Sequence, residues 1–139
     1  MNKRNTVLLA VLAAGVGAAT IWGRGDPGGS ATTTEAVVNV TLPDTFSGAA
    51  RMGQRAFNST CAACHGANAA GSDAGPPLVH RIYEPSHHGD EAFELAVKNG
   101  VRAHHWKFGN MPSQPGLTDA DLSAVIAYVR ELQRANGID

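Results

Sequence analysis

Apolar residues recur at helical spacing in three stretches of the chain. The clearest stretch lies near the carboxyl end, where Thr118 is followed three residues later by Asp121 in a capping-box pattern. Its apolar positions, three or four residues apart, are Leu122, Val125, Ile126, Val129 and Leu132. A second helix is expected over residues 90–99, because Gly100 is a typical helix stop.

The first expected helix begins at Asp44 or Thr45 and runs straight into residue 61. Its inward positions are expected to be Ala49, Met52, Gly53, Ala56 and Phe57. The segments between the helices, such as 71–77 with its two adjacent prolines, are predicted to be loops. Helices at both ends of a compact domain, with loops between them, predict an all-α fold with about three main helices.

The first 24 residues have the order of an export signal, with Lys3 and Arg4 ahead of an apolar run over 7–22. This run is slightly shorter than the roughly 17 to 25 residues of a spanning helix, so a cleaved signal peptide and an uncleaved signal anchor both remain open. We therefore expect a periplasmic protein, with residues 7–22 as its candidate attachment to the outer face of the cytoplasmic membrane.

Residues 25–43 are rich in Gly, Ser, Thr and Pro and predict a flexible linker, in which the alternation over 36–40 is compatible with an edge strand. Residues 44–139 are then expected to form a single domain.

Aromatic residues make up only 6% of the chain, so a buried cofactor would add apolar volume to a thin core. The formal net charge of -1 and the lack of a basic stripe argue against a nucleic-acid partner.

Both cysteines of the chain fall in one C-x-x-C-H motif, Cys61-Ala62-Ala63-Cys64-His65. Residues three apart lie on one side of a helical turn, so both thiols can add to the two vinyl groups at one edge of a porphyrin. The histidine that follows can then ligate the iron. The motif predicts one covalently bound haem c, attached at Cys61 and Cys64, with His65 on the metal.

Three other uses of the cysteine pair fit less well. A redox dithiol is expected in a strand and βα context, which the pattern lacks. A zinc site would have to recruit two distant histidines. A disulfide is compatible with export, but the three-residue gap would make a tight, strained ring.

The strongest candidate for a second axial ligand is Met111, in the sequence Gly109-Asn110-Met111-Pro112. A methionine taken alone would be assigned to core packing. After a C-x-x-C-H motif, a methionine in a loop stiffened by Pro112 and Pro115 favours iron ligation instead. Met52 lies on the amino side of the cysteines, in the first expected helix.

These residues resemble the class I cytochromes c over about residues 46–137. The spacing of Gly53 and Phe57 resembles a pattern in the family's first helix, where the glycine permits close crossing by the last helix. Tyr128 stands where that last helix carries its usual aromatic residue. The resemblance implies a cytochrome c fold, in which the amino- and carboxy-terminal helices cross beside one covalently bound haem.

The segment Gly75-Pro76-Pro77-Leu78 is similar to the family's Gly-Pro-x-Leu loop. By this resemblance, the carbonyl of Pro76 accepts a hydrogen bond from His65 and the side chain of Leu78 packs on the haem. The resemblance also implies iron closed on its two faces by His65 and Met111.

A closed coordination sphere leaves no iron position for a substrate, so the resemblance implies an electron carrier in a respiratory or photosynthetic chain and not an enzyme. Its partners would be a redox donor and a redox acceptor, each bound transiently. Two alternatives remain open. A haem sensor or minor peroxidase would need Met111 to be off the iron or easily displaced, and a subunit role in an oxidase or reductase complex is also compatible with the sequence.

Two pairs of histidines have no counterpart role in the family: His87-His88 and His104-His105. They fit a solvated loop set around the haem propionates, a labile copper or zinc site, or a histidine that replaces Met111 on iron. Trp106 is expected either to donate its indole hydrogen to a propionate or to pack as a core residue.

Overall fold

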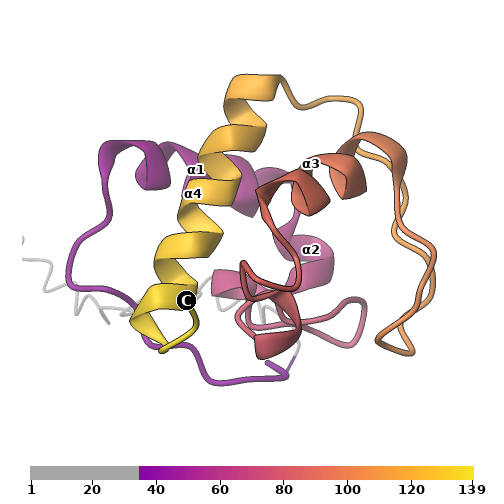
Figure 1. The fold of residues 1–139 in the computed structure, drawn as a ribbon, viewed down its shortest axis with the longest axis horizontal. Coiled ribbons are helices and arrows are strands. Elements are labelled where there is room, and N and C mark those ends of the chain that lie inside the picture. The colour runs from indigo at the N-terminus through magenta and orange to yellow at the C-terminus, as the bar shows by residue number, and fades with distance from the viewer. Residues whose placement is uncertain (1–34) are drawn as a thin grey trace, which may run out of the picture. The chain divides into compact units, whose positions relative to one another are not determined.

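A computed structural model describes residues 35–139, and Figure 1 shows their path. The predicted signal peptide or anchor over 1–24 lies outside the described residues, as does most of the predicted linker. Within these residues, four α-helices follow one another: α1 Gly48–Thr60, α2 Ala62–His65, α3 Asp90–Asn99 and α4 Asp119–Ala135. Two short 3-10 turns, Ala67–Ala69 and Arg81–Tyr83, lie between α2 and α3. Over residues 35–139 there is no strand beyond one isolated bridge, so the all-α prediction is confirmed.

Helix α4 has the cap and the buried face that the sequence predicted. The Thr118 hydroxyl accepts from the Asp121 amide at 3.1 Å, and the Asp121 carboxylate accepts from the Thr118 amide at 3.2 Å. All five predicted apolar positions of α4 are buried. This capping box provides hydrogen-bond acceptors for backbone amides that have none within the first turn of the helix. The apolar stripe packs in the core.

Helix α1 begins later than predicted, because Ser47 and neither Asp44 nor Thr45 caps it. The Ser47 hydroxyl accepts from the Ala50 amide at 3.1 Å. The inward face of α1 is Ala50, Gly53 and Phe57. The prediction that Ala49 and Met52 point inward was therefore wrong; Met52 is 55% exposed. The reason is that α1 packs mainly on α4, and a single partner helix covers only a narrow stripe.

Helices α1 and α4 cross in close contact, as the family resemblance implied (Figure 1). A Cβ added at Gly53 would lie 1.8 Å from the carbonyl oxygen of Ala124, so only glycine fits at this crossing. Beside it, the ring of Tyr128 packs on Phe57 and Phe46, with centroids 5.5 and 5.3 Å away. These rings form the centre of the main apolar core.

The segment before α1 packs on the domain, although the sequence predicted a flexible linker up to residue 43. The amides of Val37 and Val38 both donate to the carbonyl of Ala70, at 3.0 Å each, without forming the edge strand considered for 36–40. Further along, Thr41 and Asn136 exchange two hydrogen bonds of 2.9 and 2.8 Å. Val40 also packs against the main core. Apolar packing and hydrogen bonds, some of them to the Asn136 side chain, thus hold residues that composition alone assigned to a linker.

Candidate haem-binding site

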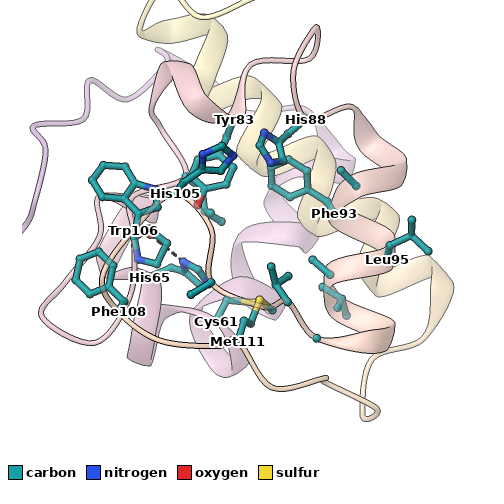
Figure 2. A pocket seen from close by; sticks show the side chains of 18 of the residues that line it. Cys61, His65, Tyr83, His88, Phe93, Leu95, His105, Trp106, Phe108 and Met111 are labelled. Carbon is teal, nitrogen blue, oxygen red and sulfur yellow. Dashed lines mark hydrogen bonds between the residues drawn. The ribbon is translucent and has the colours of Figure 1, made fainter.

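One cavity of about 510 Å³ lies between the end of α1, helices α3 and α4, and the loops that precede and follow α3 (Figure 2). Its walls are mostly apolar, and α3 and α4 contribute Phe93, Val97, Leu122 and Ile126. Cavities of this size and character commonly hold a cofactor or another small molecule. Within residues 35–139, the cavity also collects most of the candidate residues named from the sequence.

The C-x-x-C-H motif lies at the junction between α1 and α2. Cys61 is the residue between the two helices, and its side chain lines the cavity. Cys64 is exposed and does not line the cavity. Burial, and then the neighbouring Cys64, raise the pKa of the Cys61 thiol to about 11. A redox dithiol needs a readily formed thiolate, so this environment disfavours that alternative and suits an uncharged thioether.

His65 is oriented by the loop that follows it. Its Nδ1 lies 2.9 Å from the carbonyl oxygen of Pro76 (dashed in Figure 2), and because a carbonyl only accepts, Nδ1 carries the proton. This is the hydrogen bond that the resemblance implied. Burial lowers the pKa of His65, while the hydrogen bond to Pro76 partly opposes that shift. The ring is therefore neutral, with a free electron pair on Nε2, which is the form that ligates iron.

The loop over residues 71–78 is built directly onto α2. The Gly71 amide donates to the carbonyl of His65 at 2.7 Å, and the Ser72 hydroxyl donates to the carbonyl of Cys64. A Cβ at Gly75 would lie 2.8 Å from that same Cys64 carbonyl oxygen, so glycine permits the close approach. This packing places Pro76 beside His65, and Leu78 also lines the cavity.

Met111 lines the same cavity from a separate loop, whose backbone is fixed. Met111 and Val101 exchange two backbone hydrogen bonds of 2.9 Å each, and the amide of Gln114 donates to the carbonyl of Val97 at 2.7 Å. Gly100 has a φ of 77°, and a Cβ there would lie 2.7 Å from the carbonyl oxygen of Met111. The end of α3 thus holds the methionine loop by its main chain, independently of the Met111 side chain.

Trp106 gives an independent test of whether the cavity fits a haem. Its indole Nε1 is buried and has no hydrogen bond of good geometry among the described residues, and Trp106 lines the cavity. Its polar neighbour is the Tyr83 side chain, where the indole partly offsets the burial that raises the pKa of Tyr83. A buried donor without an acceptor costs about 1–3 kcal/mol, so such a group indicates a missing acceptor. A haem propionate is an acceptor of this kind. The residues present therefore fit the group: the Cys61 thiol and His65 at an apolar cavity, the buried Trp106 indole, and the Cys64 thiol three residues after Cys61, exposed on α2.

Replacing Trp106 with phenylalanine tests this assignment of the indole hydrogen. We expect the variant to retain its haem and its spectrum, because the ring volume is largely kept. We expect the midpoint potential to fall by on the order of 10–40 mV, since the propionate charge would be less compensated and 59 mV corresponds to a tenfold change in a one-electron equilibrium. Potentiometric titration measures the shift. An unchanged potential would show that Trp106 is only a packing residue.

The histidines of the 79–106 segment divide into two groups. His80 caps the second 3-10 turn, where its Nδ1 accepts from the Ile82 amide at 3.2 Å. The two adjacent pairs come together instead, and His88, His104 and His105 also line the cavity. Desolvation, followed by the neighbouring imidazoles of the two pairs, lowers the pKa of His105.

Arg130, which was not predicted from the sequence, holds the loop before α3 in place. Its guanidinium is buried on α4 and donates to the Asp90 carboxylate at 2.8 Å, to the Tyr83 carbonyl at 2.8 Å and to the His88 carbonyl. The guanidinium carbon Cζ also lies over the Phe93 ring, 4.8 Å from the ring centroid. A single arginine on a helix carries no local signal of this role, because the Asp90 carboxylate and the two loop carbonyls to which it donates are 40 or more residues away in the chain.

The chain is similar in sequence to known cytochromes c. The family model for cytochrome c matches residues 50–133, which include all of α2 and α3 and most of α1 and α4. Lupanine 17-hydroxylase [cytochrome c] from a Pseudomonas species is 38% identical over 95 residues, which are 67% of this chain but 12% of that protein. Cytochrome cL from the marine methylotroph Methylophaga aminisulfidivorans MPT is 27% identical, with a TM-score of 0.46 over 59% of this chain and 51% of that one.

The fold and the site define a small all-α haem protein. The family match covers well over half of the chain, and the chain belongs to the cytochrome c family, as a class I c-type cytochrome that carries haem c covalently. Electron transfer through the haem is the activity of this family. The chain spans only about half of the cytochrome cL structure and a small part of the hydroxylase.

Proposed function

We propose that this protein is a one-electron carrier of the cell envelope, with His65 and Met111 as the two axial ligands of its haem iron. The observation that carries the proposal is that His65, at the end of α2, and Met111, on the loop after α3, line one cavity. The Pro76 carbonyl orients the His65 ring, and main-chain hydrogen bonds fix the loop of Met111. When bound, the haem supplies the reversible one-electron couple. Thioether ligation favours the reduced state and raises the potential into the range of respiratory or photosynthetic chains.

The chain's own residues account for fast, unreactive electron exchange. His65 is held in one tautomer by Pro76, so its bond to iron is expected to be the same in both oxidation states. Met111 closes the second axial position, which excludes oxygen and peroxide. This proposed function is that of a carrier and not of an enzyme, with a donor and an acceptor that bind weakly and release quickly.

A second candidate function is an electron relay to an attached or associated enzyme. It is favoured by the match to a part of lupanine 17-hydroxylase [cytochrome c], whose length greatly exceeds that of this chain. The same haem chemistry would serve that role. Copurification in mild detergent separates the two, because a free carrier leaves its partners and a subunit retains them.

The proposed location is the periplasm, on the basis of the export-like order of residues 1–24. Within residues 35–139, no helix has the length and apolar character needed to cross a membrane. The predicted attachment segment 7–22 lies outside the described residues. Sequencing the amino terminus of the mature protein distinguishes a cleaved signal from a retained anchor.

Visible spectra of the holoprotein test the proposed axial ligation. The protein is produced with cytochrome c maturation machinery and recorded oxidised, reduced, and reduced under carbon monoxide. We expect sharp c-type bands on reduction, a weak sulfur-to-iron band near the red end of the oxidised spectrum, and no change with carbon monoxide. High-spin bands and rapid carbon monoxide binding would instead indicate an open iron, as in a sensor or peroxidase.

A further inference from the structure

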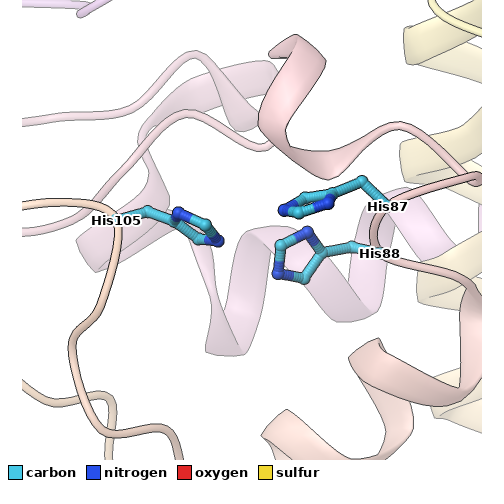
Figure 3. Close-up of side chains that lie close together, drawn as sticks. All are labelled: His87, His88 and His105. Atoms are coloured by element: carbon cyan, nitrogen blue, oxygen red, sulfur yellow. The ribbon is translucent and has the colours of Figure 1, made fainter.

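Three histidines outside the C-x-x-C-H motif form a compact cluster, here called the histidine triad: His87, His88 and His105. One ring nitrogen from each lies within 4.8 Å of the other two (Figure 3). The triad is not a local pair, because the loop before α3 contributes two members and the loop after α3 contributes the third. Two segments about 17 residues apart therefore converge on one point.

The main chain of both segments is held in place. The amides of His87 and His88 donate to the Glu84 carbonyl at 3.0 and 2.8 Å, and the His88 carbonyl accepts from the buried Arg130. In the loop after α3, the amide of Ala103 donates to the Asn110 side chain at 2.9 Å, close to the bridge that anchors Met111. The convergence of the triad thus depends on contacts that are built into the fold.

The ring of His88 is also held in a tautomer that leaves one nitrogen free to bind a metal. The Nδ1 of His88 lies 2.6 Å from the carbonyl oxygen of Ile82 and must donate to it, which leaves the electron pair on Nε2. A backbone carbonyl on one ring nitrogen is the usual support for a histidine that ligates a metal through the other. His87 and His105 are exposed, so an ion can reach the triad from solvent.

We propose that the histidine triad binds one copper ion, at a site separate from the haem iron. The donor set consists of three imidazoles, without a thiolate or a carboxylate among the clustered groups. Imidazole nitrogen suits copper and zinc better than magnesium or calcium, and copper(II) binds a given nitrogen site more tightly than the other divalent first-row metals. His104 is not part of the triad; its Nδ1 donates to the Arg102 carbonyl at 2.8 Å, and its ring packs on His105.

The experiment is a metal titration of the haem-loaded protein, prepared without a histidine tag and treated with chelator. Copper(II) is added and followed by calorimetry and by electron paramagnetic resonance. We expect one ion per chain, with nitrogen hyperfine structure on the copper signal and an unchanged haem spectrum. Zinc(II) should compete more weakly. Tighter binding of zinc than of copper would overturn the assignment to copper.

Matched variants decide whether the triad itself is the site. His87→Gln and His105→Gln should each weaken copper binding by about tenfold or more, since each removes one ligand from a different segment. His80→Asn is the control, because an asparagine oxygen can still accept from the Ile82 amide and His80 lies outside the triad. Affinity unchanged in His105→Gln would show that only the local His87-His88 pair binds, and would overturn the proposal.

Copper binding by the histidine triad does not depend on whether Met111 ligates the haem iron, and the titration distinguishes copper binding from iron ligation. Copper bound with normal haem bands supports the triad whatever the axial ligand is. A shift of the haem bands that parallels copper binding would place the ion's effect at the haem and contradict a separate site. Absence of saturable binding at one equivalent would also overturn the proposal.

Discussion

The Met111→Ala variant is expected to lose the weak sulfur-to-iron band of the oxidised protein and to gain carbon monoxide binding in the reduced state. Without the thioether, the iron has a weak or vacant sixth position. The midpoint potential should fall by at least about 100 mV, within the range of roughly 0.8 V that axial ligation spans in haem proteins. Absorption spectroscopy and potentiometric titration measure both effects.

The local structure makes this substitution a clean test. The loop that carries Met111 is held by backbone hydrogen bonds to Val101 and by the bond from Gln114 to the end of α3. Alanine can keep all of these bonds, so the change should remove the ligand and leave the loop in place. A residual potential close to that of the unmodified protein would therefore mean that Met111 is not on the iron.

Met52→Ala is the matched control. Met52 is the other methionine of the described region, and it is half exposed on α1 and does not line the cavity. Its replacement should leave the band and the potential unchanged. If the band persisted in Met111→Ala, the assignment of Met111 as an axial ligand would be wrong.

The elements that the sequence predicted well are those whose signals are local. Helix α4 has a capping box and a five-residue apolar stripe, and both are present in the structure. The start of α1 was misplaced because Asp44, Thr45 and Ser47 are all acceptable caps, and only packing on α4 selects among them. The prediction that Met52 points inward was wrong because α4 buries only a narrow stripe of α1.

The haem site was predictable for a related reason. The attachment motif is contiguous, so its chemistry predicted Cys61 and His65 as haem-binding residues. The resemblance to class I cytochromes c predicted the hydrogen bond from His65 to the Pro76 carbonyl, which the structure contains. The histidine triad was only partly predictable. Its ligand types are visible in the sequence, but their convergence depends on Arg130 and on loop closure through Asn110, which no local pattern encodes.

The crossing of α1 and α4 links stability to this site, because Phe57 follows Gly53 on α1, Cys61 directly follows the end of α1, and both residues line the cavity. Gly53 therefore does more than permit packing between two helices. Any change that separates the helices at Gly53 should also move the residues that wall the haem cavity. The haem spectrum and the unfolding transition are expected to respond together.

Gly53→Ala should destabilise the folded protein by about 3 kcal/mol, because the new Cβ would lie 1.8 Å from the Ala124 carbonyl oxygen and neither helix backbone can yield without opening the core. For a domain of this size the melting temperature should fall by roughly 10–20 °C. Gly48→Ala is the control: it adds the same methyl group at the start of α1, with nothing within 4 Å, and should change stability by no more than about 0.5 kcal/mol. Equal melting temperatures for the two variants in calorimetry would show that α1 and α4 do not cross as closely as the structure places them.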